Sequence, residues 1–433
     1  MSWLGNLTTD FEEGMRCTLL WYAENHKIPL PRCLILVFPE ETLRIVYLSD
    51  NLTIHDERFL QKLTQRGYDT WLITYYHELS VPEPMQRIDR LHIIHWHNPH
   101  YARRFKSDGE YVSIESSGWR GQLLAIQGLW QCLQHFRRIL AEIRPDIVHA
   151  GWVYSSGLIA ALSGFRPWLL MPWGSDVQVM PYQSHGRRIV ARYVFRQANM
   201  ITCDCQAVKD NIIRLSGYSA DRIVVAPWGV DLHQFRPMNH LNSIRSQLGW
   251  EHSKILIVTR QLKSFYGIEY LISAMPLILA AEPQARLLIC GDGPLETALR
   301  NSVGELHLES MVHFAGFVPN HLLPAYLNAA DIYVSPSLED GSSLCLMEAM
   351  ACGLPSVVTN VPAVLEWVEH GHNGYVVSKR DVEGLASAVV NMLRNDSSRA
   401  KMGKASLATA QVRADWDKNF KTVEEIYHHL IQQ

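Results

Sequence analysis

The sequence predicts an α/β protein with two Rossmann-like, doubly wound domains facing a cleft. Short apolar runs alternate with longer amphipathic segments along most of the chain, which is typical of parallel sheets covered by helices. The alternation pauses at a polar, proline-containing stretch, residues 235–240, and then begins again. The 433 residues are enough for two cores of about 200 residues each.

The first domain is predicted over residues 41–236 and opens with a β-α-β unit. Strands at 43–49 and 70–74 enclose a helix at 55–66. The remaining strands are predicted at 91–97, 146–149, 168–171, 200–202 and 223–227, and the remaining helices at 121–143 and 186–198. Residues 1–40 form an N-terminal extension to which the sequence assigns no role.

The second domain is predicted over residues 241–414. Its strands are expected at 254–259, 286–290, 312–314, 332–334 and 357–358, and its helices at 268–281, 322–329 and 344–352. A last helix at 416–431, within the segment 415–433, is expected to pack back on the first domain.

The composition is that of a soluble protein, with 47% apolar residues, 19% charged residues and a net charge of −3. This charge argues against a dedicated nucleic-acid binder. The eight cysteines show no paired spacing typical of a metal site, and we interpret them as reduced thiols. No apolar run approaches the roughly 18 residues of a membrane span. A cytoplasmic protein is expected.

An anion site is predicted where the strand at 332–334 is followed by a helix. The small residues Gly341, Ser342 and Ser343 allow a ligand to approach the backbone closely. Ser342 or Ser343 can cap the helix that begins at Leu344, and Gly353 ends it. The free N–H groups and the positive dipole end of such a helix suit a diphosphate.

Two carboxylates bracket this predicted anion site, Asp340 before it and Glu348 within the helix. Phosphates repel carboxylates, so these side chains are expected to face hydroxyl groups instead. A sugar nucleotide carries hydroxyls on both sides of its diphosphate. We therefore expect Asp340 to bind the sugar and Glu348 to bind the ribose.

The spacing Asp340-x7-Glu348, followed by Ala-Met-Ala-Cys-Gly-Leu-Pro, resembles the E-x7-E signature of the family 4 glycosyltransferases, which have the GT-B fold. The resemblance extends from about Leu43 to the C-terminus. It implies a retaining, metal-independent glycosyltransferase of the hexosyltransferase type. The donor would be a UDP- or GDP-sugar, and the acceptor a saccharide or lipid-linked molecule of polysaccharide or glycolipid biosynthesis. The family's first Glu is Asp340 here, and a family Lys is replaced by Tyr266.

Arg260 is the strongest candidate for a cation at the diphosphate. It follows the strand 254–259, and ligands of such sheets bind at the carboxyl ends of strands. Together with the amides of residues 342–344 it would stabilise the leaving diphosphate during catalysis. Lys263 is a second candidate, in place of the Lys that Tyr266 replaces, and its alternative is a solvated loop position.

The acceptor side is predicted in the first domain. Trp173, Gly174, Ser175 and Asp176 follow the strand 168–171 and resemble a sugar-facing or acceptor-side loop of the family. Asp176 could act in catalysis by orienting an acceptor hydroxyl, or it could cap the next helix, and both remain open.

Two histidines of the first domain are further candidates. His149, at the predicted end of the strand 146–149, matches a family His that faces the transferred sugar, and its alternative is a buried, hydrogen-bonded histidine. His55 lies in the first βα loop, where an acceptor-side role competes with a role in capping the helix.

No cofactor and no obligatory metal are expected beside the nucleotide sugar. His92, His95, His97 and His100 invite a zinc assignment, but no acidic or cysteine partner lies close by in the sequence. Asp415 and Asp417 sit at the start of the last predicted helix, where acidic residues are common. Gly291-Asp-Gly-Pro294 is too short for a dinucleotide fingerprint, and a turn is the simpler interpretation.

A basic ridge on the helix 186–198 suggests peripheral contact with the inner face of a membrane. Arg187, Arg188, Arg192 and Arg196 form the ridge, with Ile189, Val190, Tyr193 and Val194 placed on the opposite side. A solvated amphipathic helix is the alternative.

Two other functions compete with sugar transfer. A GT-B-type sugar-nucleotide epimerase would share the donor site and need no acceptor. A non-catalytic sugar-nucleotide-binding subunit is favoured by the two departures from the family pattern, Tyr266 and Asp340.

Overall fold

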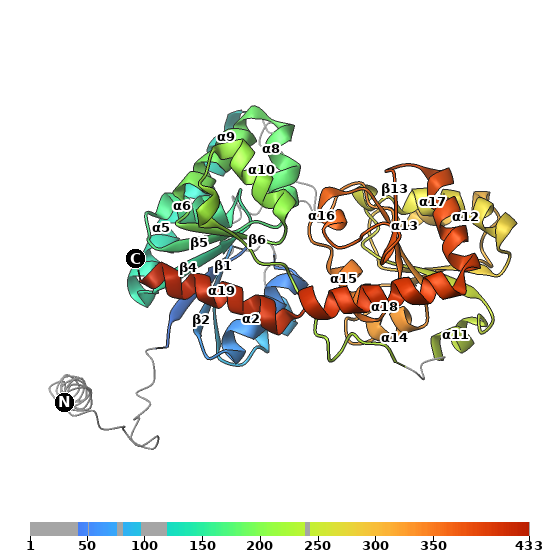
Figure 1. Ribbon diagram of the computed structural model, residues 1–433. Coiled ribbons are helices and arrows are strands. Elements are labelled where there is room, and N and C mark those ends of the chain that lie inside the picture. Colours follow the sequence, from blue (N-terminus) through green and yellow to red (C-terminus); the bar gives the residue numbers. More distant parts are fainter. Residues whose placement is uncertain (1–41, 51, 76–80, 97–118, 239–242, 433) are drawn as a thin grey trace, which may run out of the picture. The chain divides into compact units, whose positions relative to one another are not determined.

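The computed structural model describes residues 42–50, 52–75, 81–96, 119–238 and 243–432 (Figure 1). The predicted N-terminal extension, His97 and His100 lie outside the described residues. Two parallel sheets organise the rest of the chain, as the alternation of apolar runs and helices predicted. The prediction of two parallel-sheet α/β domains is thereby confirmed.

The first sheet has seven parallel strands in the order β3-β2-β1-β4-β5-β6-β7. The strands are β1 (Arg44–Leu48), β2 (Asp69–Thr74), β3 (Leu91–His95), β4 (Ile147–Gly151), β5 (Trp168–Met171), β6 (Met200–Cys203) and β7 (Ile223–Val225). β1 pairs with both β2 and β4, so the direction of winding reverses there. The carboxyl ends of strands at such a switch point are where open α/β sheets bind ligands.

The second sheet has six parallel strands in the order β10-β9-β8-β11-β12-β13. The strands are β8 (Lys254–Thr259), β9 (Ala285–Cys290), β10 (Val312–Gly316), β11 (Ile332–Ser335), β12 (Ser356–Thr359) and β13 (Gly374–Val377). β8 lies between β9 and β11, so the switch point falls between β8 and β11. Arg260 follows β8 directly. The loop 336–343, which carries the predicted anion site and is called the anion loop below, follows β11, so both reach the same edge of the sheet.

Helices cover both sheets (Figure 1). Those between the strands of the first sheet are α2 (Ile54–Gln65), α3 (Glu83–Gln86), α5 (Trp119–Ile143), α6 (Ser156–Ser163), α7 (Ser175–Gln178), α8 (Met180–Gln183), α9 (His185–Gln197) and α10 (Gln206–Ser216). Those that follow are α11 (Ser243–Leu248), α12 (Ile268–Ala281), α13 (Glu296–Glu305), α14 (Leu323–Asn328), α15 (Leu344–Ala351), α16 (Pro362–Leu365), α17 (Val382–Arg394), α18 (Asp396–Arg413) and α19 (Trp416–Ile431). Short 3-10 turns lie at η2 (Ala220–Arg222) and η3 (Ser264–Tyr266).

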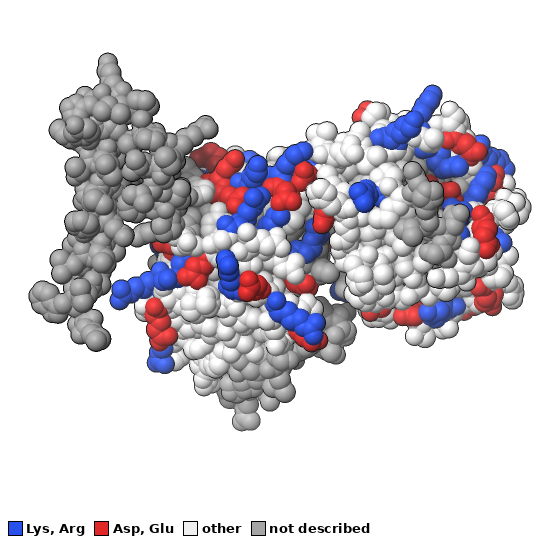
Figure 2. Space-filling model, turned by 90° about the horizontal axis from the view of Figure 1, so that it is seen from below, with Lys and Arg blue, Asp and Glu red and all other residues white. Residues whose placement is uncertain are grey.

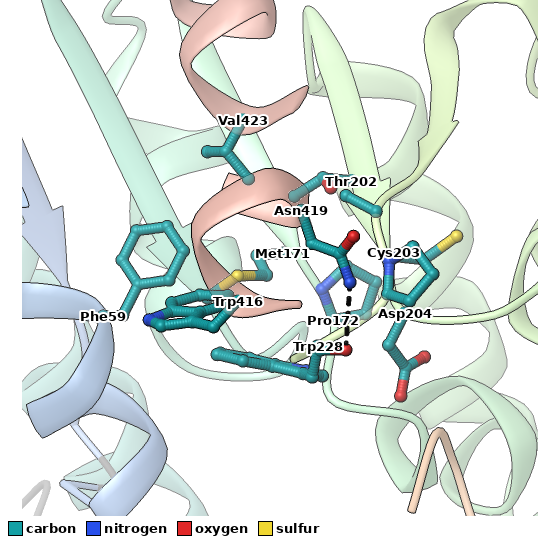
Figure 3. Close-up of a pocket in the computed structure, with 12 residues that line it drawn as sticks. Phe59, Met171, Pro172, Thr202, Cys203, Asp204, Trp228, Trp416, Asn419 and Val423 are labelled. Carbon is teal, nitrogen blue, oxygen red and sulfur yellow. Dashed lines mark hydrogen bonds between the residues drawn. The ribbon is translucent and has the colours of Figure 1, made fainter. Parts of the chain in front are cut away.

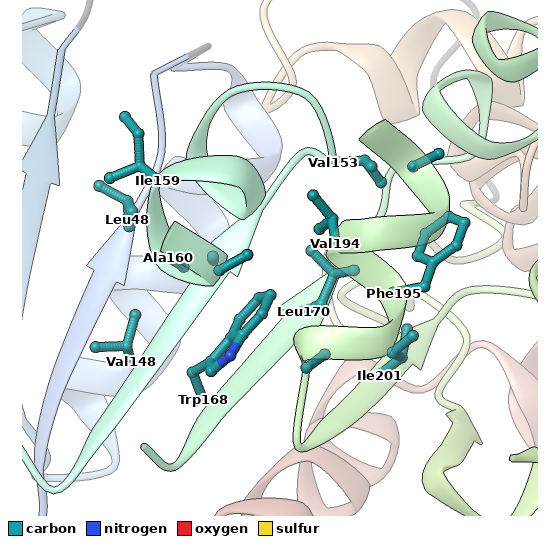
Figure 4. Packing of buried hydrophobic residues seen from close by; sticks show 14 of the residues in the cluster. Leu48, Val148, Val153, Ile159, Ala160, Trp168, Leu170, Val194, Phe195 and Ile201 are labelled. Carbon is teal, nitrogen blue, oxygen red and sulfur yellow. The ribbon is translucent and has the colours of Figure 1, made fainter. Parts of the chain in front are cut away.

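The core of the first sheet forms where α6 and α9 pack on its strands. Figure 4 shows Trp168 and Leu170 of β5 meeting Ala160 of α6 and Val194 and Phe195 of α9. All of these side chains are at most 1% exposed. Burying a large apolar side chain contributes roughly 1.5–3 kcal/mol, so this contact fixes the helices that carry the loops after β4 and β5.

The last helix, α19, packs against the first sheet, as predicted (Figure 1). Its buried residues, Phe420, Val423, Ile426, Tyr427 and Leu430, recur at helical spacing and join the cluster that contains Tyr47 and Phe59. Asp415 caps α19 by accepting hydrogen bonds from the amides of Asp417 and Lys418. Asp415 and Asp417 therefore lie at the N-terminal end of α19, and Asp417 also forms an ion pair with Lys62 of α2.

The basic ridge of α9 differs from its predicted arrangement. Arg192 and Arg196 donate hydrogen bonds to the carbonyls of Leu215 and Ser216, at the end of α10. Ile189 and Tyr193 are 66% and 38% exposed, so they share the exposed side with the arginines and do not lie opposite them. The buried side of α9 is made by Ala191, Val194 and Phe195. Contact of α9 with a membrane stays a prediction.

Charge on the surface is mixed. In the view of Figure 2, acidic and basic side chains lie interspersed over both sheet domains. Within the described ranges, no helix is both long and apolar enough to cross a bilayer.

Candidate functional site

The loop before α15 has the local structure that the sequence predicted. Ser343 is the N-cap, and its Oγ accepts a hydrogen bond from the amide of Leu346 at 3.3 Å. At the other end, Cys352 is the C-cap, and Gly353 follows it with φ of +80°. The amide end of a buried eight-residue helix therefore faces the switch point of the second sheet.

Arg260 and Asp340 form a buried ion pair at this switch point. Their side chains are 7% and 8% exposed, and Arg260 also donates a hydrogen bond to the Oγ of Ser343. The ring of Tyr266 lies 4.6 Å from the guanidinium and stacks on it. The Nε of Arg260 is buried and has no hydrogen-bond partner among the described residues. One strong donor thus remains unpaired beside the helix end.

The turn Gly291-Asp-Gly-Pro294 supports the backbone that carries Arg260. A methyl group on Gly291 would lie 2.0 Å from the carbonyl oxygen of Arg260, and one on Gly293 would lie 2.8 Å from the amide of Leu262. Both glycines have positive φ, +142° and +153°. Leu262 donates to the carbonyl of Asp292 at 2.7 Å. The motif is therefore a turn, and the absence of side chains on its two glycines lets it contact the backbone of residues 260–262.

Glu348 lies buried in the second turn of α15. Its Oε1 accepts a hydrogen bond from Asn320 at 3.2 Å. Burial raises the pKa of the carboxyl to about 7, and the nearby guanidinium groups of Arg58 and Arg260 oppose the rise. No other described residue donates a hydrogen bond to this carboxylate, which leaves acceptor positions for a hydroxyl-bearing ligand.

Lys263 is not brought into contact with Asp340 or Ser343 by any described interaction. It is half-buried, and its Nζ lies 6.0 Å from the ring of Phe265. Tyr266 occupies the place beside Arg260. A role of Lys263 at the site stays a prediction.

The loop after β5 meets the anion loop across the two domains. Gly174 has φ of +102°, and a methyl group on it would lie 3.5 Å from the Cα of Gly341. Trp173 precedes Gly174, and Ser175 begins α7. The sequence placed these residues on an acceptor side, and the structure brings their backbone to the helix end of the second domain.

Asp176 ties two loops of the first domain together. Its carboxylate is fully buried and accepts hydrogen bonds from the amides of Val153 and Trp173 at 3.0 and 2.9 Å. Burial raises its pKa to about 7, although these amides oppose the rise. The N-cap of α7 is Gly174, so the expectation that Asp176 caps this helix is wrong. A direct role toward an acceptor hydroxyl stays a prediction.

His149 lies in the interior of the first domain. β4 continues to Gly151, so His149 is not at the strand end, where the sequence placed it. Its side chain is 0% exposed, its Nδ1 lies 2.6 Å from the hydroxyl of Tyr427, and burial lowers its pKa to about 3. The structure thus shows a buried, hydrogen-bonded histidine, the alternative that the sequence left open.

Replacing Tyr427 with Phe is expected to lower the free energy of unfolding by about 1–2 kcal/mol, because the buried Nδ1 of His149 would lose its partner. Urea unfolding of Tyr427→Phe against the parent protein measures this. Tyr193→Phe, which removes a hydroxyl from the exposed side of α9, is the matched control. Equal stability of all three proteins would show that this hydrogen bond is not formed.

His55 lies closer to the site than His149. Thr53 caps α2 and forms a capping box with Asp56, so His55 is not the capping residue. Its ring packs 5.3 Å from Trp173 and 5.5 Å from Trp228, and its buried Nδ1 has no hydrogen-bond partner among the described residues. Burial, with smaller effects of Arg58 and Arg260, lowers its pKa to about 4. His55 is therefore a neutral imidazole near Arg260.

Asp204, which the sequence analysis missed, occupies part of the predicted anion site. It follows β6 in the first domain, and its Oδ2 accepts a hydrogen bond at 2.7 Å from the amide of Ser342. It is buried, and burial raises its pKa. Its position directly after a strand is the signal that could have identified it.

Glu366 of the second domain makes the reciprocal contact. Its two carboxylate oxygens accept hydrogen bonds, each at 3.0 Å, from the amides of Gln206 and Ala207 at the start of α10. Glu366 thus lies on the first amides of α10, which is electrostatically favourable, whereas Asp204 binds the amide of the residue before the N-cap of α15.

A small cavity lies beside the two segments that connect the domains (Figure 3). Its volume is about 20 Å³, enough for roughly one water molecule. Trp228 and Trp416 stack at its edge with ring centroids 5.5 Å apart, and Asn419 donates to the carbonyl of Trp228. A paired bridge between Val230 and Asp415 joins the same two segments. The cavity is too small for a substrate, so we assign it to the packing of these connections.

In the part of the chain that the structure describes, no three His, Cys, Asp or Glu side chains are grouped as metal ligands. His92 stacks on Trp71 and lies 3.5 Å from Asp69.

Two family models match the chain, one in each domain. Residues 44–205 match the model described as "Glycosyl transferase 4-like", and residues 242–408 match "Glycosyl transferases group 1". Among curated relatives, a glycosyltransferase assigned to teichuronic acid biosynthesis in Bacillus subtilis is 26% identical over 70% of this chain and 78% of its own. A D-inositol 3-phosphate glycosyltransferase of Corynebacterium efficiens is 30% identical over 53% of this chain and 56% of its own. The match thus spans between half and four fifths of these two relatives.

Solved structures share the fold. A sucrose-phosphate synthase from Thermosynechococcus elongatus matches with a TM-score of 0.74 and 20% identity, over 90% of this chain and 99% of its own. HepE from Anabaena, solved in complex with UDP-glucose, matches with a TM-score of 0.71 and 19% identity, over 90% of this chain and all of its own.

Proposed function

The chain belongs to the family 4 glycosyltransferases, which have the GT-B fold, and we propose that it is a retaining enzyme that transfers a sugar from a UDP- or GDP-sugar to a saccharide or lipid-linked acceptor. The observation that carries the proposal is the group of side chains at the switch point of the second sheet. There the buried Arg260, the amide end of α15 and the buried Glu348 lie together. Positive charge beside a hydroxyl-binding carboxylate is the combination that a nucleotide sugar needs.

Each of these groups would bind a different part of the donor. The open Nε of Arg260 and the amides of residues 342–344 would hold the diphosphate. Glu348 would accept hydrogen bonds from the ribose, and Asp340, oriented by its ion pair with Arg260, would accept them from the sugar. The proposal includes no metal or other cofactor, because guanidinium and amide donors of the protein would compensate the charge of the leaving diphosphate.

The transfer step would break the bond between the anomeric carbon and the diphosphate oxygen and form a bond from that carbon to the acceptor oxygen. No described carboxylate is placed as an obvious nucleophile on the opposite side of the sugar, so we propose substitution on one face. The leaving diphosphate oxygen would take the proton of the acceptor hydroxyl. Asp176 supports this geometry indirectly, because it orders the Trp173–Gly174 loop that meets the anion loop.

The direct test is to incubate the protein with UDP- and GDP-sugars, with and without a panel of saccharide and lipid-linked acceptors, and to follow products by NMR. Acceptor-dependent release of the nucleoside diphosphate, with the new linkage in the donor's anomeric configuration, is expected. An isomerised nucleotide sugar formed without acceptor would identify an epimerase instead. Binding of donors without turnover on any acceptor would identify a non-catalytic binding subunit.

Peripheral membrane contact would suit a lipid-linked acceptor. The exposed side of α9 combines Arg188 with Ile189 and Tyr193, a mixture of charge and apolar surface that binds anionic bilayers. Co-sedimentation with vesicles containing anionic lipid tests it, and Arg188→Glu should weaken the association. Sedimentation that does not depend on lipid charge would count against this contact.

Asp204 is expected to compete with the donor, because its carboxylate holds the amide of Ser342 that a phosphate would use. Asp204→Asn removes this charge and should tighten binding of UDP or GDP several-fold, as measured by calorimetry. Asp210→Asn, which removes an exposed carboxylate of α10 that bonds only to Gln206 in the described contacts, is the control. Weaker binding by Asp204→Asn would show that Asp204 supports the donor site.

A further inference from the structure

The second domain alone compensates a donor diphosphate poorly. Its buried cation at the switch point, Arg260, is already paired with Asp340. The neighbouring position is taken by the neutral Tyr266, which stacks on the guanidinium. A diphosphate bound beside them would bring about two negative charges to one open donor and a helix end. Another cation is needed, and the first domain holds one.

Arg58 of α2 lies at the connections between the two domains. It is half-buried, and its Nη2 donates a hydrogen bond at 2.7 Å to the carbonyl of Gly229. Its guanidinium lies 5.8 Å from the ring centroid of Trp416. Gly229 and Trp416 belong to the two connecting segments, which touch so closely that a methyl group on Gly229 would lie 2.5 Å from the Cα of Trp416. Arg58 is thus anchored where the domains join.

The charge of Arg58 has no direct ion-pair partner in the part of the chain that the structure describes. Among the ion pairs of the described residues, none includes Arg58. Burial lowers the pKa of its guanidinium, and the carboxylates of Glu348 and Asp231 oppose this effect. The ring of His55 packs on Trp228, which precedes the Gly229 carbonyl that holds Arg58. It also packs on Trp173, which precedes the Gly174 that meets Gly341 at the predicted anion site. Arg58 therefore lies on the side of the first domain that faces this site, and the charges of Arg58 and Arg260 both act on the pKa of Glu348 and of His55.

We propose that Arg58 supplies, from the first domain, a second cation for the phosphates of the donor, opposite Arg260. This inference rests on the proposed function and adds a residue to the same site. Arg58 and Arg260 would flank the diphosphate, and the neutral His55, with its unpartnered Nδ1, would lie between them as a hydrogen-bonding group. Because Arg58 is held at Gly229, donor binding would also link the phosphates to the connection between the domains.

Titration calorimetry of Arg58 variants with UDP, UMP and uridine, and with the guanosine series, tests this inference. Arg58→Ala should weaken binding of the diphosphate about 10- to 100-fold, the effect of losing one charge-assisted hydrogen bond, and leave nucleoside binding unchanged. The dependence of diphosphate affinity on salt should also become shallower. Arg66→Ala is the matched control, since Arg66 is the C-cap of the same helix and contacts Asp417 and Glu424 of α19.

Arg58→Gln separates charge from structure, because Gln can still donate to the carbonyl of Gly229. If Arg58→Gln binds diphosphates as tightly as the parent protein, the charge is not used and the inference is overturned. An equal loss of affinity for nucleoside and diphosphate by Arg58→Ala would also overturn it, since that pattern indicates a misplaced helix. A parent protein that binds neither UDP nor GDP would overturn the proposed function itself, and this inference with it.

Discussion

Replacing Arg260 with Ala is expected to lower kcat/KM by about 10²–10³-fold and to destabilise the protein by about 3 kcal/mol. The loss of activity follows from removing a fixed positive charge where negative charge develops on the leaving diphosphate. The loss of stability has a separate cause, because Asp340 would remain buried without its ion-pair partner. The single variant therefore combines a catalytic and a structural effect.

A second variant separates these two effects. In Arg260→Ala/Asp340→Ala both buried charges are gone, so most of the lost stability should return, as measured by urea unfolding. The activity should stay low, because neither the cation nor the carboxylate that we propose to bind the sugar is restored. Arg300→Ala is the control, since it removes an exposed helix-surface arginine paired with Glu296. If the double variant recovers its activity together with its stability, Arg260 acts only in folding.

Local sequence signals predicted the elements that carry the second-domain site. The strand that ends before Arg260, the cap at Ser343 and the positive-φ Gly353 each depend on a few neighbouring residues. Apolar β-branched runs and small capping residues leave a clear mark in any single sequence. The position of Arg260 at a strand end followed from the same local reasoning.

Some helices escaped prediction because their periodicity is weak. α6 is short and almost uniformly apolar, with five of its residues buried, so it shows no polar face. α18 has small and polar residues around most of its circumference and buries mainly Met402, Gly403, Ser406 and Ala410. A pattern that depends on one apolar face cannot reveal such helices.

The long-range contacts were beyond reach for a different reason. Asp204 and Ser342 are 138 residues apart, and Arg58 and Gly229 are 171 residues apart. Nothing in the local sequence of either partner indicates that they meet. Likewise, the orientation of His149 toward Tyr427 of the last helix depends on how α19 packs, 278 residues away. Long-range packing decides which of several plausible polar residues reaches the site.

Glu348 should make donor binding depend on pH. Burial raises the pKa of its carboxyl to about 7, and only the ionised form can accept hydrogen bonds from both ribose hydroxyls. Affinity for a nucleotide sugar should therefore rise by up to about tenfold between pH 6 and pH 8. A nucleotide sugar is the right probe, since its diphosphate has no titrating terminal oxygen in this range. Calorimetry of the parent protein and Glu348→Gln at both pH values measures the effect.

The Gln variant should bind more weakly at pH 8 and show a flat pH profile, because its side chain does not titrate. Comparing ribose with 2′-deoxyribose donors adds a double-mutant cycle. The loss of the 2′-hydroxyl should lower the affinity of the parent protein about tenfold or more, and that of the variant much less.

The stability of the protein without ligand supplies an independent check. A carboxyl whose pKa is higher in the folded state than in the unfolded chain stabilises the fold at low pH, and this contribution is lost as the pH rises toward 7. The substitution Glu348→Gln should therefore raise the free energy of unfolding more at pH 8 than at pH 5. A parent protein whose affinity for the donor does not change with pH would show that the carboxylate of Glu348 does not bind the donor.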